Sequence, residues 1–479
     1  MDRLSGLDAS FLYLETPAQL MHVCAMIVLD PSTMPPRSDG GEGYEFTAFQ
    51  REIERHVRDV PTFTRKLRRV PMGLDHPIWV RDKQFDIERH VHRLALPAPG
   101  GYKELVQLTS HLAGLPLDRS RPLWEMWIVE GYDDGKIVCF AKMHHATVDG
   151  VSGSNLISHL CALEPDAEPM ASGTGEQHSR DVGSRELFVR GVASRLSLPV
   201  QAARLVGPTA SGVGRTIGRA RAGTAMAAPL TAPRTSFNGT ITGHRTIGLV
   251  DVDLGHVRAV KQATGTTVND VVLAVTGGAL RAYLEQRGEL PESSLLASVP
   301  VSVRDSSRRS AGANKVSSLF ARLGTDTADP LERLRDMAER NRNAREHHDA
   351  ISADSLQDWA EFAAPRTFGL AVRAYAGLRL AERHPVVHNL VISNVPGPPV
   401  PLYFLGAEIL GLYPLGPVFH GAGLNVTVMS NNGRLHVGVI ACRESVPDAE
   451  ALVAHFPAEL DRIRAAVAAD EQGLPTINR

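Results

Sequence analysis

Apolar positions in residues 1–165 alternate between helical and strand spacing along the chain. They recur at helical intervals over Phe46–Val57 and Tyr102–Ala113, which predicts two amphipathic helices. Apolar residues dominate Pro77–Val80 and Lys136–Lys142, which predicts two strands. This part of the chain therefore mixes both kinds of element.

A second mixed region extends from about Thr246 to the C-terminus, and its pattern predicts a helix over Val268–Gln286. Predicted strands of this region are Leu249–Asp253, Ser298–Val303, Leu390–Ile392 and Leu424–Val428. Prolines and polar residues interrupt the charge-free stretch Ile409–Gly433, which predicts strands and turns instead of a membrane-spanning helix. Strands and helices in both regions indicate an α/β or α+β architecture with two lobes.

Composition excludes several classes of protein. The 479 residues carry a formal net charge of −2 and are 43% hydrophobic, which is typical of a soluble globular protein of two or more domains. A near-neutral chain is not built to hold nucleic acid over its whole surface. The four scattered cysteines give little support to zinc, iron–sulfur or disulfide sites. The N-terminus lacks a basic segment followed by an apolar run, so we expect no signal peptide and a cytoplasmic protein.

Charge is unevenly distributed between the two regions. Residues 187–250 contain no Asp or Glu but eight arginines, and Pro165–Arg185 before them is predicted to be an exposed loop. We therefore divide the chain into an N-terminal lobe (1–185), a basic connector (186–245) with helical periodicity over Leu187–Val206, and a C-terminal lobe (246–479). The connector is either a solvated linker or a basic amphipathic surface for anionic lipid headgroups or ligand phosphates.

The segment with the clearest candidate catalytic side chains begins with a strand pattern that ends in His144-His145. Asp149-Gly150 follows shortly after it, and then a helix pattern over Ile157–Leu163. Adjacent side chains at a strand end point in opposite directions, so one histidine can face a cavity while the other packs behind it. The imidazole that faces the cavity is a candidate general base, because its ordinary pKa lies near neutrality. Asp149 is expected to brace the loop through an arginine, and Gly150 to supply a turn.

A second histidine pair, His347-His348, serves as an internal control. It lies in a charged helical run, with no strand before it and no Asp-Gly after it. We expect it to form part of a solvated helix face.

The spacing His-His-x-x-x-Asp-Gly resembles the signature of the CoA-dependent acyltransferase superfamily, which includes chloramphenicol acetyltransferase and the condensation domains of peptide synthetases. Other segments narrow the resemblance to the bacterial wax ester synthase/diacylglycerol acyltransferase family, and the arginine-rich composition suggests an actinobacterial member. These segments follow the family's order along most of the chain: Leu7–Leu12 with Glu15 and Met21-His22, Trp79-Val80, Phe85–Ile87, His90-Val91, Pro116–Arg119, Pro122–Glu125, Thr267–Val271, Pro300–Arg304, Asn314–Ser317 and Ser393–Pro398.

The resemblance implies two chloramphenicol-acetyltransferase-like lobes with the active site at their interface. It implies an O-acyltransferase that moves a long-chain acyl group from acyl-CoA to diacylglycerol, making triacylglycerol, or to a fatty alcohol, making a wax ester. Acyl-CoA is then a substrate, and no cofactor or metal is expected. Hydrophobic substrates favour a location at the inner membrane or at lipid droplets. The alternatives are another hydroxyl acceptor, such as a glycolipid or polyketide alcohol, and a non-catalytic lipid-binding protein that kept the fold.

The resemblance also implies roles for single residues. His145 is the expected general base, and His144 is expected to support the loop. Asp149 is expected to pair with an arginine, for which Arg304 is the candidate. Asn269 is expected near the reaction centre, whereas Asn269 and Asp270 also suit helix capping, and the two roles are compatible.

Two further segments leave alternatives open. Pro122, Leu123 and Trp124 either contact substrate or, as we favour, pack in the core. Ser393 and Asn394 precede a turn that either lines the channel between the lobes or serves only as a turn. The family often shows Ser-Tyr-x-Gly and a later Asp where this chain has Ser430–Gly433 and Cys442-Arg443, which puts substrate preference in doubt more than catalysis.

Overall fold

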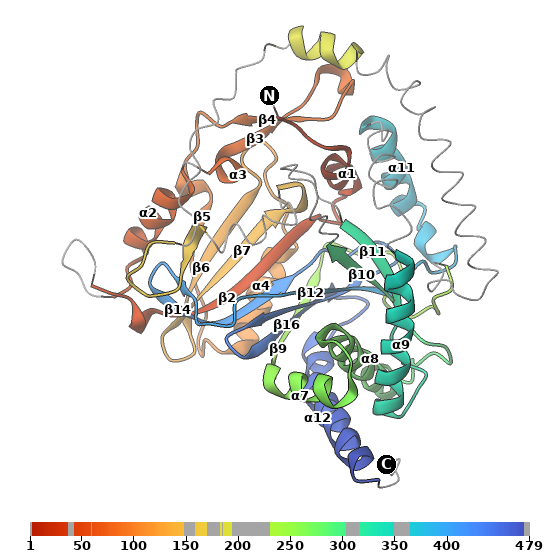
Figure 1. Cartoon of the computed structure of the whole chain (residues 1–479). Helices are drawn as coiled ribbons and strands as arrows, with labels where there is room; N and C mark the ends of the chain where they lie inside the picture. The colour runs from red at the N-terminus through yellow and green to blue at the C-terminus, as the bar shows by residue number, and fades with distance from the viewer. Residues whose placement is uncertain are drawn as a thin grey trace.

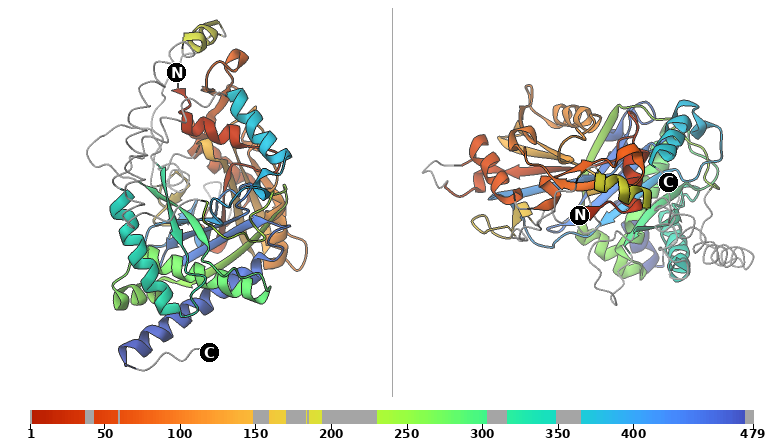
Figure 2. Two further views of the ribbon diagram at one scale, coloured as in Figure 1. Left: turned by 90° about the vertical axis from the view of Figure 1, so that its right-hand side faces the viewer. Right: turned by 90° about the horizontal axis from the view of Figure 1, so that it is seen from above.

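Over the residues that it describes, the computed structural model of the chain contains three sheets, and two of them form the two lobes (Figure 1). The structure describes residues 2–36, 43–58, 60–147, 159–169, 183, 185–193, 230–302, 316–348 and 365–473. The N-terminal strand and the last helix lie at opposite ends of the molecule in two of the views (Figures 1 and 2).

The larger sheet has seven strands in the order β5-β6-β7-β2-β14-β13-β8. Their bounds are β2 His22–Asp30, β5 Val91–Ala95, β6 Trp124–Tyr132, β7 Lys136–His144, β8 Cys161–Ala162, β13 Tyr403–Phe404 and β14 Ala407–Leu415. The pairs of neighbouring strands are antiparallel except for β5 and β6, which run parallel. Strand β7 is buried along almost its whole length, as its near-continuous apolar run predicts.

Part of the C-terminal region belongs to this first sheet. Strand β14 pairs with β2 from Glu408↔Asp30 to Leu415↔Cys24, so residues far apart in the chain are neighbours in one sheet. The sequence boundaries at 185 and 245 stay a prediction, but the two lobes are not strictly consecutive in the chain.

The second sheet has six strands in the order β11-β10-β12-β15-β16-β9. Their bounds are β9 Arg245–Asp253, β10 Leu296–Ser302, β11 Val316–Arg322, β12 Leu390–Val395, β15 Leu424–Asn431 and β16 Arg434–Cys442. Four helices gather beside it (Figure 1): α7 Leu254–Thr264, α8 Val268–Gln286, α9 Pro330–His348 and α12 Ala449–Glu471. Apolar side chains of this sheet and of these helices form the largest hydrophobic core.

The remaining elements surround the first sheet or join the lobes. Strands β1 Asp2–Arg3, β3 Arg65–Arg68 and β4 Ile78–Arg81 form a small sheet. The helices are α1 Gly6–Leu14, α2 Phe46–Val57, α3 Pro61–Thr64, α4 Tyr102–Ala113 and α11 Pro365–Gly377. Short 3₁₀ turns are η1 Pro31–Thr33, η2 Pro71–Gly73, η3 Ile87–Arg89, η4 His145–Thr147 and η5 Leu380–Glu382.

A separate hydrophobic cluster joins the two lobes. It combines Phe140 and Trp127 of the first sheet and Leu105 of α4 with Ile247 and Ile440 of the second sheet. Burial of such apolar surface is the main stabilising term at a domain interface. The lobes are therefore packed against each other through side chains of both.

The helices predicted over Phe46–Val57, Tyr102–Ala113 and Val268–Gln286 are confirmed with those bounds. Each predicted strand is confirmed within a few residues, and Arg345–His348 of the control segment are helical. The helix predicted over Ile157–Leu163 is wrong at its end: Cys161 and Ala162 form β8 and pair with β13. A short apolar run suits either element, and here the pairing partner decides.

Among the described residues, no helix is both long and apolar enough to cross a membrane. Ile409–Gly433 instead supplies parts of β14 and β15, as its interruptions predict. All four cysteines are buried and free.

Candidate active site

The histidine pair lies where β7 ends and the turn η4 begins. Both neighbours of β7 hold its backbone at this point. The His144 N–H donates to the Leu123 carbonyl at 2.9 Å, and the His145 N–H donates to the Met21 carbonyl at 2.7 Å. The turn is therefore anchored on both sides.

His145 is half-buried, and its ring stacks on Phe11 of α1 with centroids 4.1 Å apart and planes 30° from parallel. Its Nδ1 is buried and has no hydrogen-bond partner among the described residues. Burial lowers the pKa of His145 to about 4. The imidazole is thus neutral at physiological pH, with a lone pair available to accept a proton.

His144 is the buried member of the pair, with 1% of its surface exposed. Its Nδ1 accepts a hydrogen bond from the Ala146 N–H at 3.0 Å, and its carbonyl accepts one from the Thr147 hydroxyl at 2.6 Å. The expectation that one histidine packs behind the other is confirmed, and His144 holds the backbone of the turn that carries His145.

The Glu15 carboxylate lies next to His144, the buried histidine of the pair. Glu15, which follows α1, places Oε2 3.4 Å from His144 Nε2 and Oε1 3.3 Å from His22 Nε2, and it also pairs with Arg119. Burial alone would raise the pKa of Glu15, but the two histidines and Arg119 more than offset burial and hold it well below its usual range. Burial lowers the pKa of His22 to about 4 and also lowers that of His144. The described cluster is thus one anion, one cation and two neutral imidazoles.

Segments of the second lobe reach this region. Helix α1 packs against α11, with Tyr13 edge-on to Phe368 at 6.4 Å (Figure 1). The His420 N–H donates to Gln19 Oε1 at 2.8 Å, and Arg245 donates to the Ala18 carbonyl at 2.5 Å. The loop between α1 and β2 is therefore held by the second lobe, and the histidines lie close to the interface.

Helix capping is confirmed for Asp270 but not for Asn269. Asp270 forms a capping box with Thr267 at the start of α8 and accepts a hydrogen bond from Asn341 of α9 at 3.0 Å. Asn269 is half-buried in the first turn, and its side chain makes no hydrogen bond with any described residue. No hydrogen bond joins it to the described histidines, so its place near the reaction centre stays a prediction.

The segment Pro122–Trp124 is part of the core. Leu123 is fully buried beside Ala146 and Leu12. Trp124 is 1% exposed, stacks on His90, and donates its indole N–H to the Phe63 carbonyl at 2.9 Å. The favoured packing role is confirmed, and a direct substrate contact by Leu123 or Trp124 would require the core to open.

Ser393 and Asn394 are half-buried on β12, which pairs with β15. The turn after them is held by Ser430 and by Asn431, which stands where the family often has Tyr. Gly397 donates its N–H to the Ser430 hydroxyl at 3.2 Å, and the Asn431 side chain donates to the Pro398 and Val400 carbonyls at 3.1 and 3.2 Å. Asn432 and Gly433, with φ of 41° and 80°, form the tight hairpin between β15 and β16. The turn role is confirmed, and a role in lining a channel stays a prediction.

Asp149, Gly150 and Arg304 lie outside the described residues, so their roles stay predictions. Sequence reasoning missed four residues around the histidines: Phe11, Glu15, His22 and Arg119. Phe11, Glu15 and His22 belong to the opening segment that carried the family resemblance, and Arg119 to a later one. Their positions in the sequence did not show that they contact the histidines, because they lie far from His144 in the chain and meet it only after folding.

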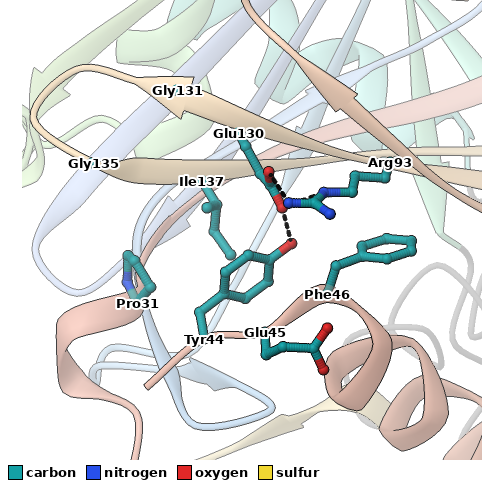
Figure 3. A pocket seen from close by; sticks show the side chains of 9 residues that line it. All are labelled: Pro31, Tyr44, Glu45, Phe46, Arg93, Glu130, Gly131, Gly135 and Ile137. Atoms are coloured by element: carbon teal, nitrogen blue, oxygen red, sulfur yellow. Dashed lines mark hydrogen bonds and ion pairs between the residues drawn. The ribbon is translucent and has the colours of Figure 1, made fainter. Parts of the chain in front are cut away.

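A hollow of about 440 Å³ lies elsewhere on the first lobe (Figure 3). Glu130 accepts a hydrogen bond from the Tyr44 hydroxyl at 2.8 Å and two from Arg93 at 2.9 Å, and Arg93 lies 5.7 Å above the Phe46 ring. These groups satisfy one another, and neither histidine of the pair lines the hollow. In the part of the chain that the structure describes, no three His, Cys, Asp or Glu side chains are grouped to hold a metal ion.

Two family models match the chain and together span most of it. The wax ester synthase/diacylglycerol acyltransferase catalytic domain matches residues 4–272, and the C-terminal domain of the same family matches residues 312–464.

Known proteins are similar over almost the whole length. A putative diacylglycerol O-acyltransferase of Mycobacterium tuberculosis (strain H37Rv) is 44% identical over 97% of this chain and 90% of its own. A probable diacylglycerol O-acyltransferase of the same strain, tgs2, is 35% identical over 98% and 100%.

Among solved structures, the wax ester synthase/diacylglycerol acyltransferase of Marinobacter aquaeolei VT8 is 29% identical, with a TM-score of 0.68 over 97% of this chain and 100% of that one. A starter condensation domain of rhizomide synthetase, 16% identical over 98% of this chain and 95% of that one, shares the fold with a TM-score of 0.51. The two-lobed fold, the histidine turn and these matches agree: the chain belongs to the wax ester synthase/diacylglycerol acyltransferase family.

Proposed function

We propose that the chain is an acyl-CoA-dependent O-acyltransferase that moves a long-chain acyl group to diacylglycerol and makes triacylglycerol, with fatty alcohols as second acceptors. The observation that carries the proposal is the neutral, partly accessible His145, held on a rigid turn in a chain of this family. The names of the mycobacterial relatives support diacylglycerol as the first acceptor.

In the proposed mechanism His145 acts as general base through Nε2, because Nδ1 is buried against the turn. Nε2 takes the proton of the acceptor hydroxyl while that oxygen bonds to the thioester carbonyl carbon. The tetrahedral intermediate then collapses, the carbon–sulfur bond breaks, and the imidazolium returns the proton to the CoA thiolate. A positioned base of this kind supplies roughly 10²–10⁴-fold of the rate.

Other predicted residues enter this mechanism as proposals. Asn269 would polarise the thioester carbonyl, and Asp149 with Arg304 would brace the loop after the turn. Ser393 and Asn394 would line the substrate channel beside the fastened turn. No step depends on a cofactor; acyl-CoA is a substrate.

We also propose a peripheral position at a membrane or lipid droplet. Leu370 and Leu378 of the α11 region are 67% and 57% exposed, with Arg373 between them, and Val189 in the helical residues 185–193 is 64% exposed. Exposed apolar side chains beside arginines suit an interface that contains anionic lipid.

The predicted basic connector contributes less of this charge than its sequence indicates. Arg234 donates to the Asn238, Ala381 and His384 carbonyls, and Arg245 is 4% exposed and bound to backbone carbonyls. Arg190 is exposed and pairs with Glu186. The other five arginines lie outside the described residues.

Flotation tests the lipid proposal. Vesicles of phosphatidylcholine with and without phosphatidylglycerol are mixed with the wild-type chain and with a Leu370→Ser/Leu378→Ser variant. The variant should float less with both compositions, and the wild type should bind better when anionic lipid is present. Equal flotation of the two proteins would reject α11 as the contact.

Acceptor profiling tests the reaction. Palmitoyl-CoA is offered with dioleoylglycerol, hexadecanol, a glycolipid or no acceptor, and the products are separated by thin-layer chromatography. Triacylglycerol is the expected main product. A clear product with another acceptor and none from dioleoylglycerol would reject the diacylglycerol assignment, and no product with any acceptor would favour a lipid-binding protein.

A further inference from the structure

One largely buried group outside the proposed reaction is the Glu15 carboxylate, whose side chain is 9% exposed. It is shared by side chains from three segments: His144 at the end of β7, His22 at the start of β2, and Arg119 in the loop before β6. Both histidines are at most 4% exposed, and they lie opposite each other in the register of β2 and β7. A carboxylate this deeply placed would be costly without partners, so its position calls for an explanation.

Hydrogen bonding at His144 determines where its proton is. The Nδ1 atom accepts the Ala146 N–H at 3.0 Å, so it carries no hydrogen itself. The proton of the neutral ring is therefore on Nε2, the nitrogen that faces Glu15 at 3.4 Å. A negative carboxylate beside Nε2 favours this tautomer over the Nδ1–H form, which could not accept the Ala146 N–H.

The tautomer matters because the Ala146 N–H belongs to the turn that presents His145. The same turn is closed by Thr147 on the His144 carbonyl. Loss of the Nε2–H tautomer would leave the Nδ1–H of His144 facing the N–H of Ala146 where β7 meets η4, and would push the turn away from its present geometry. His145 would then lose its stacking on Phe11 and the direction in which Nε2 points.

Charge in the cluster is already balanced. Arg119 neutralises Glu15 and also donates to the Leu12 carbonyl at 3.0 Å, which ties the end of α1 to the loop before β6. Lys142, the next cation on β7 that faces the same side, is occupied by the Leu112 and Leu115 carbonyls and by Glu125 at 3.6 Å. Glu15 therefore contacts the two histidines and does not form an ion pair with Lys142.

We infer that Glu15 is a positioning residue, which holds His144 in the Nε2–H tautomer and through it fixes the turn that presents His145. The inference rests on the proposed acyl transfer for its kinetic consequences and on no other part of the mechanism. It predicts that Glu15 and His144 act as one unit, as groups that position a catalytic histidine do in other hydrolytic and acyl-transfer sites.

A double-mutant cycle tests this coupling. Glu15→Gln should lower kcat on the order of tenfold to a hundredfold with little change in the KM for acyl-CoA, and Glu15→Asp should recover part of the loss. Glu15→Gln should cost almost nothing more in a His144→Gln background, because the ring through which it acts is gone. Equal losses in both backgrounds would overturn the inference.

Asp82→Asn provides a matched control. Asp82 is also a buried carboxylate of the first lobe with a cationic partner, Lys66 at 2.9 Å, and it pairs with neither histidine of the turn. Its loss should leave kcat near the wild-type value and should not couple to His144→Gln. Melting temperatures are measured for every variant, and the Glu15→Asp variant keeps the test usable if Glu15→Gln unfolds.

The tautomer itself gives a readout that does not need activity. Nitrogen NMR of histidine-labelled protein, with His144 assigned by its loss in His144→Gln, should show Nε2–H in the wild type and a shifted mixture in Glu15→Gln. An unchanged His144 spectrum in Glu15→Gln would overturn the inference even in an active enzyme. An inactive wild type with the predicted spectra would instead refute the proposed function and leave the positioning role supported.

Discussion

Gly278, in the middle of α8, offers a test in which two physical effects have opposite signs. An alanine Cβ at this position would stand 2.1 Å from Glu459 Cδ and 2.4 Å from Arg333 Nη1. These two side chains form an ion pair at 2.5 Å and are 2% and 0% exposed, so neither can move aside into solvent. Helix propensity alone would favour Gly278→Ala by about 1 kcal/mol.

The clash is expected to win. Overpacking costs roughly 1–3 kcal/mol, and disturbing a buried ion pair costs about 3–5 kcal/mol. Allowing for the propensity gain, we expect a net loss of about 3 kcal/mol in the free energy of unfolding. At an unfolding entropy of about 2.1 cal/mol/K per residue, this corresponds to a fall of about 3 °C in Tm if the chain melts as one unit.

Differential scanning calorimetry measures the change, with Gly239→Ala as control because a Cβ at Gly239 meets nothing within 4 Å. The control should melt within about 1 °C of the wild type. A Gly278→Ala variant as stable as the wild type, or more stable, would show that the Arg333–Glu459 pair is not packed as described.

Three further predictions concern the site. Because burial lowers the pKa of His145 to about 4, kcat/KM should change less than about twofold between pH 7.5 and 5.5. A base with the ordinary pKa of 6.5 would lose about tenfold over this range, so a half-activity point near 6.5 would contradict the burial of His145. Phe11→Leu removes the stacked ring, worth roughly 0.5–1.5 kcal/mol, and should lower kcat/KM about two- to tenfold; an unchanged value would show that stacking does not orient His145. His22 is buried in its neutral form and its pKa is lowered to about 4, so its contribution to stability is fully present above about pH 6.5 and is lost as pH falls toward 4. His22→Gln should therefore flatten the acid side of a plot of Tm against pH, and an unchanged plot would reject this contribution.

Local pattern was sufficient where one segment determines its own structure. The helix Phe46–Val57 has a strong apolar stripe, and Val268–Gln286 begins at a capping box, so both could be bounded from sequence. The histidine turn could also be placed, because a buried strand pattern ends at His144.

Long-range pairing was not predictable from local pattern. The sequence of Ala407–Leu415 does not show that this strand pairs with β2 in the first sheet. The sequence of Cys161-Ala162 does not show that these residues form a strand by pairing with β13. Glu15 carried no sign of its partners, because its contacts with His22, His144 and Arg119 exist only after α1, β2 and β7 assemble. Tertiary context therefore decides the parts that the sequence left open.

We propose that His145 is the general base of acyl transfer, and release of CoA tests this role. Release of free CoA from palmitoyl-CoA in the presence of dioleoylglycerol should fall by roughly 10²–10⁴-fold in His145→Ala. His348→Ala, in the other histidine pair of the chain, should release CoA at the wild-type rate. Equal CoA release by His145→Ala and the wild type would show that His145 is not the general base.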